Sequence, residues 1–410
     1  MISISRDGWL IIGARTLRSF AFGFFSVHIA LYLRGLGYDE AQIGLLLSIA
    51  LGGSAALTII LSGVADRWGR RRVLIICGLL MCAAGLVFAA SDNLVALLLA
   101  ALTGAVSVTS SEVGAFIAVE QATLPQTAPH EQRTTLFSLY NFTSYAALAV
   151  GALASGLPDF LRGSVAPVTT QRLLYLGYGM VGAAVALLYT RLSAAVEVQD
   201  EAVKKPLLAL GLGPSRAIVL RLAGLQSVDA FAGGLVVQSL IALWLNLRFG
   251  VGGDVLGVVF FFANLCSTAS LLAAPAIARR IGLLNAMVFT HLPSNLLLML
   301  IPLMPSFELA VLTLLLRQCL SQMDVPTRQA YTMALVAPDE RSAAAGVTVV
   351  ARAVANAISP SLSGIALRYV ALGLPFIAGG LLKSGYDIAL YFTFRNVPLP
   401  VESEGLKDLV

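Results

Sequence analysis

The stretch Ser62-Gly63-Val64-Ala65-Asp66-Arg67-Trp68-Gly69-Arg70-Arg71-Arg72-Val73 decides the fold of this chain. It joins one apolar run, at 43–61, to a second apolar run at 73–90. A connection this short makes the two runs antiparallel neighbours. Four arginines place the connection on the cytoplasmic side of a membrane, because cytoplasmic loops next to a span carry the excess of Lys and Arg.

The composition is that of a membrane protein. The 410 residues are 58% hydrophobic and only 12% charged, whereas about 25% of the residues in a soluble globular chain are charged. The apolar runs approach the length of a bilayer-spanning helix and lack the alternation of a barrel strand. The sequence therefore predicts an all-α membrane protein. The net charge of +5 mostly reflects cytoplasmic loops, and without a basic soluble domain we expect no nucleic-acid partner.

Twelve transmembrane helices are predicted. Their approximate ranges are 9–33, 43–61, 73–90, 94–124, 133–156, 172–192, 217–247, 254–278, 285–304, 308–336, 342–372 and 375–394. The only long polar stretch between them, 197–216, indicates a cytoplasmic linker. The predicted domains are an N-terminal six-helix half at 1–196, the linker at 197–216, a C-terminal six-helix half at 217–396 and a cytoplasmic tail at 397–410. Both termini are then cytoplasmic in a multi-pass protein of the inner (cytoplasmic) cell membrane.

The two halves repeat at a spacing of roughly 210 residues. Glu120-Gln121-Ala122 in the fourth helix matches Arg328-Gln329-Ala330 in the tenth, and Phe20-Ala21-x-Gly23 in the first helix matches Phe231-Ala232-x-Gly234 in the seventh. By the same register, Asp229 occupies the position equivalent to Arg18. Parallel repeats of six helices related by an axis along the membrane normal occur in secondary transporters.

The arginine loop carries a resemblance to a known family. Its core, Asp66-Arg67-x-Gly69-Arg70-Arg71, resembles the signature loop between the second and third helices of the major facilitator superfamily. The family pattern opens Gly-x-Leu-Ala-Asp-Arg, and this chain departs from it with Ser62 and Val64 in place of Gly and Leu. The resemblance implies two parallel six-helix repeats and transport of a small molecule by alternating access. It also implies a conformational switch at the loop, with Asp66 near the start of the eleventh helix, around Arg341 and Ser342. The predicted switch residues are Asp66, Arg67, Gly69, Arg70 and Arg71.

Charges inside the membrane indicate the functional site, because a charge at mid-bilayer costs roughly 2.5–3.5 kcal/mol and normally faces a cavity or a partner. The resemblance implies that the first, fourth, seventh and tenth helices line a central cavity, and most buried charges of this sequence lie on those four. The predicted cavity for substrate and protons comprises Arg15, Arg18, Glu112, Asp229, Arg317, Asp324 and Arg328.

Arg15 and Arg18 lie one helical turn apart, and two interpretations stay open for them. They either reach the inner interface along their apolar stems or face the cavity. Since Arg18 and Asp229 are equivalent in the repeat, we expect them to approach each other in the empty protein. Asp229 lies too deep in its helix for so short a side chain to reach water.

The acids of the fourth and tenth helices also leave alternatives. Glu112 has no cation three or four residues away, so it either carries protons or pairs with Arg317. Glu120 lies near the same helix face as Glu112. Asp324 and Arg328 are spaced i,i+4, so they either neutralise each other or act on substrate.

Further polar residues on the last two helices are interpreted as structural. A stripe on the eleventh helix is typical of residues that join helices. Lys383 and Asp387 are i,i+4 partners on a helix that the resemblance places against lipid. His28 and His291 receive no role. The stripe comprises Arg352, Asn356, Ser359 and Ser363.

The predicted function is secondary active transport of a small molecule, by proton-coupled export that uses Glu112, Asp229 or Asp324. The alternative is an organic anion or phosphate-ester transporter or exchanger, with cavity arginines as the binding groups. A receptor or enzyme on the same fold is the distant alternative, but no nucleophile motif is present. The scattered histidines and intramembrane cysteines predict no metal and no cofactor. We expect a monomer whose partners are substrate, protons and lipid.

Overall fold

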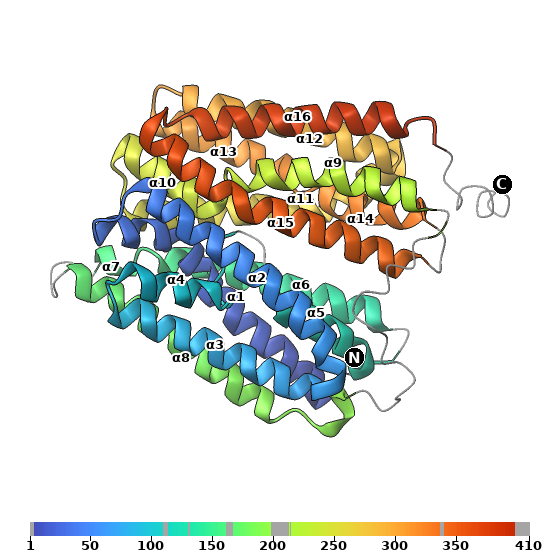
Figure 1. Cartoon of the computed structure of the whole chain (residues 1–410), viewed down its shortest axis with the longest axis horizontal. Coiled ribbons are helices and arrows are strands. Elements are labelled where there is room, and N and C mark those ends of the chain that lie inside the picture. Colours follow the sequence, from blue (N-terminus) through green and yellow to red (C-terminus); the bar gives the residue numbers. More distant parts are fainter. Residues whose placement is uncertain are drawn as a thin grey trace. The chain divides into compact units, whose positions relative to one another are not determined.

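Every regular element in the described residues is a helix (Figure 1). The computed structural model describes residues 4–109, 114–129, 132–160, 167–197, 213, 215–336 and 340–397. The predicted first half contains α1 (Arg6–Gly35), α2 (Glu40–Trp68), α3 (Arg70–Ala90), α4 (Leu94–Leu102), α5 (Ala115–Thr123), α6 (Arg133–Ala154), α7 (Leu157–Phe160) and α8 (Pro167–Thr190). The second contains α9 (Arg216–Gly234), α10 (Gln238–Phe249), α11 (Gly253–Ile281), α12 (Leu283–Leu300), α13 (Phe307–Ser321), α14 (Asp324–Ala334), α15 (Arg341–Tyr369) and α16 (Leu374–Phe394).

The predicted membrane-spanning helices are present, and three of them are interrupted. Nine helical segments in the described part of the chain are long and apolar enough to cross a membrane. The short pieces of the fourth helix, α4 and α5, and of the tenth, α13 and α14, are not among these nine segments, and neither is α16, which carries Lys383 and Asp387. The protein is therefore an all-α membrane protein, as its composition predicts.

The fourth helix is not continuous over 94–124, which corrects the sequence prediction. It ends at Leu102 and resumes at Ala115. The segment that follows Leu102 is rich in Thr, Ser, Val and Gly, which are weaker helix formers than Ala or Leu. Gly104 has φ +64, and a Cβ there would lie 2.6 Å from the backbone of Gly53 in α2. This turn therefore requires glycine for both its conformation and its close approach.

Backbone carbonyls freed by the interruption are satisfied by hydroxyl groups. The Tyr178 hydroxyl donates to Ala105 O over 2.6 Å, and Ser239 Oγ lies 3.1 Å from Val108 O. Irregular backbone at membrane depth is tolerated only where protein or water satisfies it. These two hydroxyl groups help to stabilise an open backbone segment inside the protein.

The seventh and tenth helices are also interrupted, for local reasons. The seventh is divided into α9 and α10 after Gly233 and Gly234, which are poor helix formers. The tenth is divided into α13 and α14 four residues before Pro326. Proline has no N–H to donate to the carbonyl of Gln322, and its ring crowds that carbonyl.

The packing of helix pairs repeats between the two halves. In the first half α3 lies along α8 and α1 along α6, and in the second half α12 lies along α16 and α9 along α15 (Figure 1). In order of membrane crossing, these are the third with the sixth, the first with the fifth, the ninth with the twelfth and the seventh with the eleventh. The same pairs at the same repeat positions agree with the register found in the sequence.

The chain packs as two compact units. Unit 1 comprises Met1–Leu207 with Val237–Asn264, and unit 2 comprises Leu208–Val236 with Leu265–Val410. The segment that contains α10 belongs to unit 1, where Gln238 Nε2 donates to Ser26 Oγ of α1 over 2.8 Å. The predicted domain boundary in the linker at 197–216 stays a prediction, because most of that linker lies outside the described residues.

Candidate functional site

The arginine loop is a tight connection closed by a carboxylate. Gly69, with φ +100, joins α2 to α3. The backbone N–H of Arg70 donates to Glu197 Oε2 over 2.6 Å, and that of Arg71 donates to Glu197 Oε1 over 3.2 Å. A carboxylate at a helix N-terminus is stabilised by the free N–H groups and the helix dipole. The loop is therefore tied to the chain just after α8, a contact that the sequence did not indicate.

The switch residues differ in their surroundings. Arg67 is exposed, whereas Arg70 is buried and its Nη1 donates to Ala122 O over 3.3 Å. The side chains of Asp66 and Ser342 lie outside the described residues. The expected contact of Asp66 with the start of the eleventh helix stays a prediction.

Unit 1 contains a buried ion pair between α1 and α5. Arg18 Nη2 lies 2.9 Å from Glu120 Oε2 and Arg18 Nη1 lies 3.0 Å from Glu120 Oε1, and both side chains are 0% exposed. Tyr140 donates to Glu120 Oε2 over 2.7 Å, and Tyr189 hydrogen-bonds both Arg18 and Glu120. A buried bidentate pair with its remaining lone pairs satisfied is the arrangement that offsets the cost of removing two charges from water.

Arg15 belongs to the same cluster. Its guanidinium carbon lies 3.7 Å from the centroid of the Tyr140 ring, a cation–π contact. Arg15 is 4% exposed and Arg18 is fully buried. Both arginines therefore pack against neighbouring helices, and their depth relative to the inner interface stays a prediction.

Unit 2 contains a larger cluster around Asp229 of α9. Asp229 Oδ1 lies 2.6 Å from Lys383 Nζ of α16, and Asp229 Oδ2 lies 3.0 Å from Arg352 of α15 and 3.2 Å from Arg328 of α14. Arg328 also pairs with Asp324, one turn earlier on α14. The i,i+4 neutralisation considered for Asp324 and Arg328 is confirmed, and it is one part of a cluster built from four helices.

The two clusters use the same repeat positions with exchanged charges. Arg18 and Asp229 are equivalent, and so are Glu120 and Arg328. The first repeat pairs Arg18 with Glu120, and the second pairs Asp229 with Arg328. An ion pair between the first and fourth helices of each repeat is thus retained although the sign of each charge is reversed.

The two equivalent residues Arg18 and Asp229 each obtain a counter-charge within their own unit. The expected approach of Arg18 and Asp229 in the empty protein stays a prediction. The repeat register marked two positions that each belong to a buried ion pair. It could not identify their partners, because the register carries no information about which neighbouring helix supplies the counter-charge.

The polar stripe of α15 joins that helix to α9. Ser363 Oγ donates to Leu235 O over 2.8 Å, and Arg352 Nη1 donates to Asp229 and to Gln226 O. A Cβ at Gly234 would lie 1.9 Å from Ser359 Oγ, so glycine is required for this close approach. The predicted role of the stripe in joining helices is confirmed, and Arg352 adds a cation to the Asp229 cluster.

Lys383 and Asp387 do not face lipid, which corrects the interpretation of α16. They are 7% and 1% exposed, respectively. Lys383 pairs with Asp229, whereas Asp387 Oδ1 lies 3.0 Å from His291 Nδ1 and Asp387 Oδ2 accepts from Asn295 Nδ2 over 2.8 Å. His291, which the sequence left without a role, is thus a hydrogen-bond partner of Asp387. The position of His291 inside a predicted membrane-spanning helix was the only indication in the sequence that this residue has a buried partner.

Arg317 of α13 is a buried cation of unit 2 without a carboxylate partner in the described residues. Its Nη1 donates to the neutral amide of Gln318 over 3.0 Å, and its buried Nε has no hydrogen-bond partner there. The whole residue is 9% exposed. The predicted alternative partner, Glu112, lies outside the described residues.

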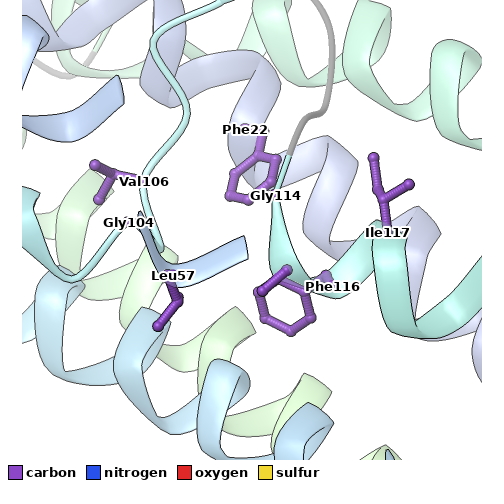
Figure 2. Close-up of a pocket in the computed structure, with 8 residues that line it drawn as sticks. Phe22, Leu57, Gly104, Val106, Gly114, Phe116 and Ile117 are labelled. Atoms are coloured by element: carbon purple, nitrogen blue, oxygen red, sulfur yellow. The ribbon is translucent and has the colours of Figure 1, made fainter. Parts of the chain in front are cut away.

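An apolar pocket in unit 1 lies beside the interruption of the fourth helix (Figure 2). Phe22 of α1, Leu57 of α2 and Phe116 of α5 line it, with Val106 from the segment between α4 and α5. The guanidinium carbon of Arg18 lies 4.1 Å from the centroid of the Phe116 ring. The pocket suits an apolar group, and the Phe116 ring that lines it also contacts Arg18.

In the ranges that the structure describes, no group of three or more His, Cys, Asp or Glu side chains could hold a metal ion. The clusters above consist of ion pairs and hydrogen bonds.

A membrane protein of Saccharomyces cerevisiae, itself uncharacterised, is 27% identical to this chain over 434 aligned residues, which cover 98% of the chain and 96% of the yeast protein.

Solved transporters share the fold. The nucleoside transporter NupG superposes with a TM-score of 0.72 at 17% identity, covering 95% of this chain and 98% of its own. The xylose transporter XylE from E. coli superposes with a TM-score of 0.71 at 16% identity, covering 97% of each chain. A human organic anion transporter superposes with a TM-score of 0.62 at 17% identity, covering 94% of this chain and 99% of its own. The sequence itself matches the Major Facilitator Superfamily over residues 11–360. With that match and the shared fold, the chain belongs to the Major Facilitator Superfamily.

Proposed function

We propose that this protein is a secondary transporter that moves a small organic anion across the membrane by alternating access. Membership of the superfamily supports transport, and the buried Arg317, which has no ion pair in the described residues, supports an anionic substrate. Of the functions considered from the sequence, this is the one that uses cavity arginines as binding groups. Proton coupling is retained in the proposal, and no enzymatic reaction is proposed.

Arg317 is the observation that carries the proposal. A charged side chain in the membrane interior is costly unless a counter-charge or water compensates it. Arg317 is buried and is hydrogen-bonded only to the neutral Gln318 amide within the described residues. A guanidinium matches carboxylates and phosphates because it presents its N–H groups in a rigid fork. A substrate carboxylate or phosphate would supply the missing charge.

The ion-paired cluster of unit 2 leaves Arg317 without a counter-charge, and a further buried carboxylate of this unit, Glu340, accepts from the backbone N–H groups of Gly213 and Ser215. The described ion pairs of this unit use three carboxylates, those of Asp229, Asp324 and Asp387. The corresponding cations are Arg317, Arg328, Arg352 and Lys383. Arg317 is the one cation of this set that lacks an ion pair, so a substrate with one negative charge would supply its counter-charge.

Two of the acids first considered as proton carriers are already neutralised. Asp229 contacts three cations and Asp324 contacts Arg328. A neighbouring cation favours the ionised carboxylate, which disfavours proton uptake. Proton coupling therefore calls for another group.

The orientation in the membrane is proposed from the sequence. We place the arginine loop and both termini in the cytoplasm and the protein, as a monomer, in the cytoplasmic membrane. The excess of positive charge in the short loop supports this orientation. Accessibility of single cysteines introduced at Trp68 and at Ser91 to a membrane-impermeant reagent tests it, since only Ser91 should react from outside.

Binding to the purified protein in lipid nanodiscs tests the substrate class. Matched pairs of ligands separate charge from shape: xylonate with xylose, and uridine 5′-monophosphate with uridine. These are compared beside a panel of carboxylates and phosphate esters. We expect tight binders to be anions, and Arg317→Gln to weaken their binding about ten-fold or more, the effect of removing a hydrogen bond to a charged group. Arg221→Gln, at an exposed arginine of the same unit, is the matched control. Equal affinity for neutral and anionic members of the pairs, or an Arg317→Gln variant that keeps its anion preference, contradicts the proposal.

A further inference from the structure

His291 and Asp387 form a buried titratable pair that lies apart from the proposed anion-binding arginine. His291 lies on α12 and Asp387 on α16, and they are 3% and 1% exposed. Asp387 Oδ1 lies 3.0 Å from His291 Nδ1, and Asn295 Nδ2 donates to Asp387 Oδ2 over 2.8 Å. Both carboxylate oxygens are thus held, and the imidazole ring is oriented by the contact at Nδ1.

The geometry fixes where a proton would be taken up. An ionised carboxylate only accepts hydrogen bonds, so Nδ1 of a neutral His291 carries the hydrogen that points to Asp387. Nε2 is then the basic atom. Histidine is the side chain whose ordinary pKa, about 6.5, allows it to gain and lose a proton under physiological conditions. A proton at Nε2 changes the charge of the pair from −1 to 0.

Lys383 connects this pair to the Asp229 cluster. It precedes Asp387 by four residues on α16, so the two side chains share one helix face. In the structure, its ammonium group lies 2.6 Å from Asp229 Oδ1. Other charged or titratable groups on helices packed around His291 are Tyr386 on α16, Asp324 and Arg328 on α14 and Asp229 on α9.

We propose that His291 and Asp387 are the proton-binding site of this transporter and that their protonation decides which carboxylate holds Lys383. With a proton at Nε2, imidazolium compensates Asp387, and Lys383 stays on Asp229. Loss of that proton leaves Asp387 with a net negative charge one helical turn from Lys383, which competes with Asp229 for the ammonium group. The proton comes from and returns to water, and no bond other than N–H changes. The use of this switch in transport rests on the proposed function.

Histidine NMR on the full-length protein tests the proton site without any substrate. The chain has three histidines, so ¹³C-histidine labelling gives three ring signals, and His28→Gln and His130→Gln identify the signal of His291 by elimination. In the wild type, we expect the ring signal of His291 to change with pH as the proton at Nε2 is bound and released. Asp387→Asn should lower its midpoint by about one pH unit or more, because imidazolium loses its neighbouring anion. His28, which is bonded to the neutral Tyr175 hydroxyl over 3.1 Å, is the matched control.

The outcome decides the proton site whatever the substrate proves to be. A His291 signal that does not titrate in wild-type protein overturns the proposal, and so does a midpoint that Asp387→Asn leaves unchanged. The wild-type titration remains informative even where the Asp387 variant does not fold.

A transport experiment separates this proposal from the proposed function. His291→Gln should abolish accumulation of an anion driven by a pH gradient and preserve anion exchange at constant pH, whereas His28→Gln should preserve both. Unaltered gradient-driven accumulation in His291→Gln sinks the proton site alone. Absence of anion exchange in wild-type protein refutes the transport function, while the NMR titration still tests the site.

Discussion

Arg18 and Glu120 show how a single buried charge depends on its partner. Both side chains are fully buried and joined by two hydrogen bonds. Glu120→Gln should lower the free energy of unfolding by about 3–5 kcal/mol, because it leaves an uncompensated charge in the interior. Arg18→Met combined with Glu120→Leu should recover most of that loss. Unfolding midpoints in one detergent measure the effect, and Glu308→Gln, at an exposed position, is the control. A single variant as stable as the wild type contradicts this account of the pair.

Removing the carboxylate of the Asp229 cluster should also destabilise the protein, because it leaves several cations without their counter-charge. Asp229→Asn leaves three cations, Lys383, Arg352 and Arg328, around a neutral amide. It should destabilise the protein, and Lys383→Met in the same background should restore part of the stability because it removes one of the repelling cations. Thermal unfolding of the two variants measures this. If Lys383→Met lowers the stability of the wild type and of Asp229→Asn by the same amount, Lys383 and Asp229 are not energetically coupled.

At the scale of elements, the interruption of the fourth helix depends on Gly104. Its φ of +64 is strained for other residues, and an added Cβ would meet the Gly53 backbone at 2.6 Å. Gly104→Ala should therefore destabilise the protein by about 1–3 kcal/mol. Gly177→Ala in α8 is the matched control, because nothing lies within 4 Å of its Cβ, and alanine is the better helix former. Melting temperatures that change equally in the two variants would show that the turn does not need glycine.

The sequence predicted the membrane-spanning helices but not their interruptions. Hydropathy averages over a whole span, so it is almost insensitive to a turn such as the one at Gly104 or the one before Pro326. The interruptions also depend on partners distant in sequence, since Tyr178 and Ser239 satisfy the open backbone of the fourth helix. The pattern of the sequence locates such hydroxyl groups without showing which carbonyl each one faces.

At the scale of the whole molecule, the repeat explains what the sequence could and could not predict about the site. The register marked Arg18 as equivalent to Asp229, and Glu120 as equivalent to Arg328. Arg18 pairs with Glu120, and Asp229 pairs with Arg328. Partner choice depends on the rotation and depth of neighbouring helices, which no local pattern encodes. Asp387 was therefore interpreted as a local partner of Lys383, although the two residues bond to different helices.

The central claim is that the protein transports an anion recognised by Arg317. The most direct test is counterflow in proteoliposomes, in which vesicles loaded with an unlabelled compound take up the labelled form. Matched anionic and neutral ligands, such as xylonate and xylose, are compared with the tightest anion found by binding. We expect rapid exchange of the anion, none of its neutral counterpart, and loss of exchange in Arg317→Gln with retention in Arg221→Gln. Exchange of the neutral compound at the rate of the anion, unaffected by Arg317→Gln, would contradict the claim.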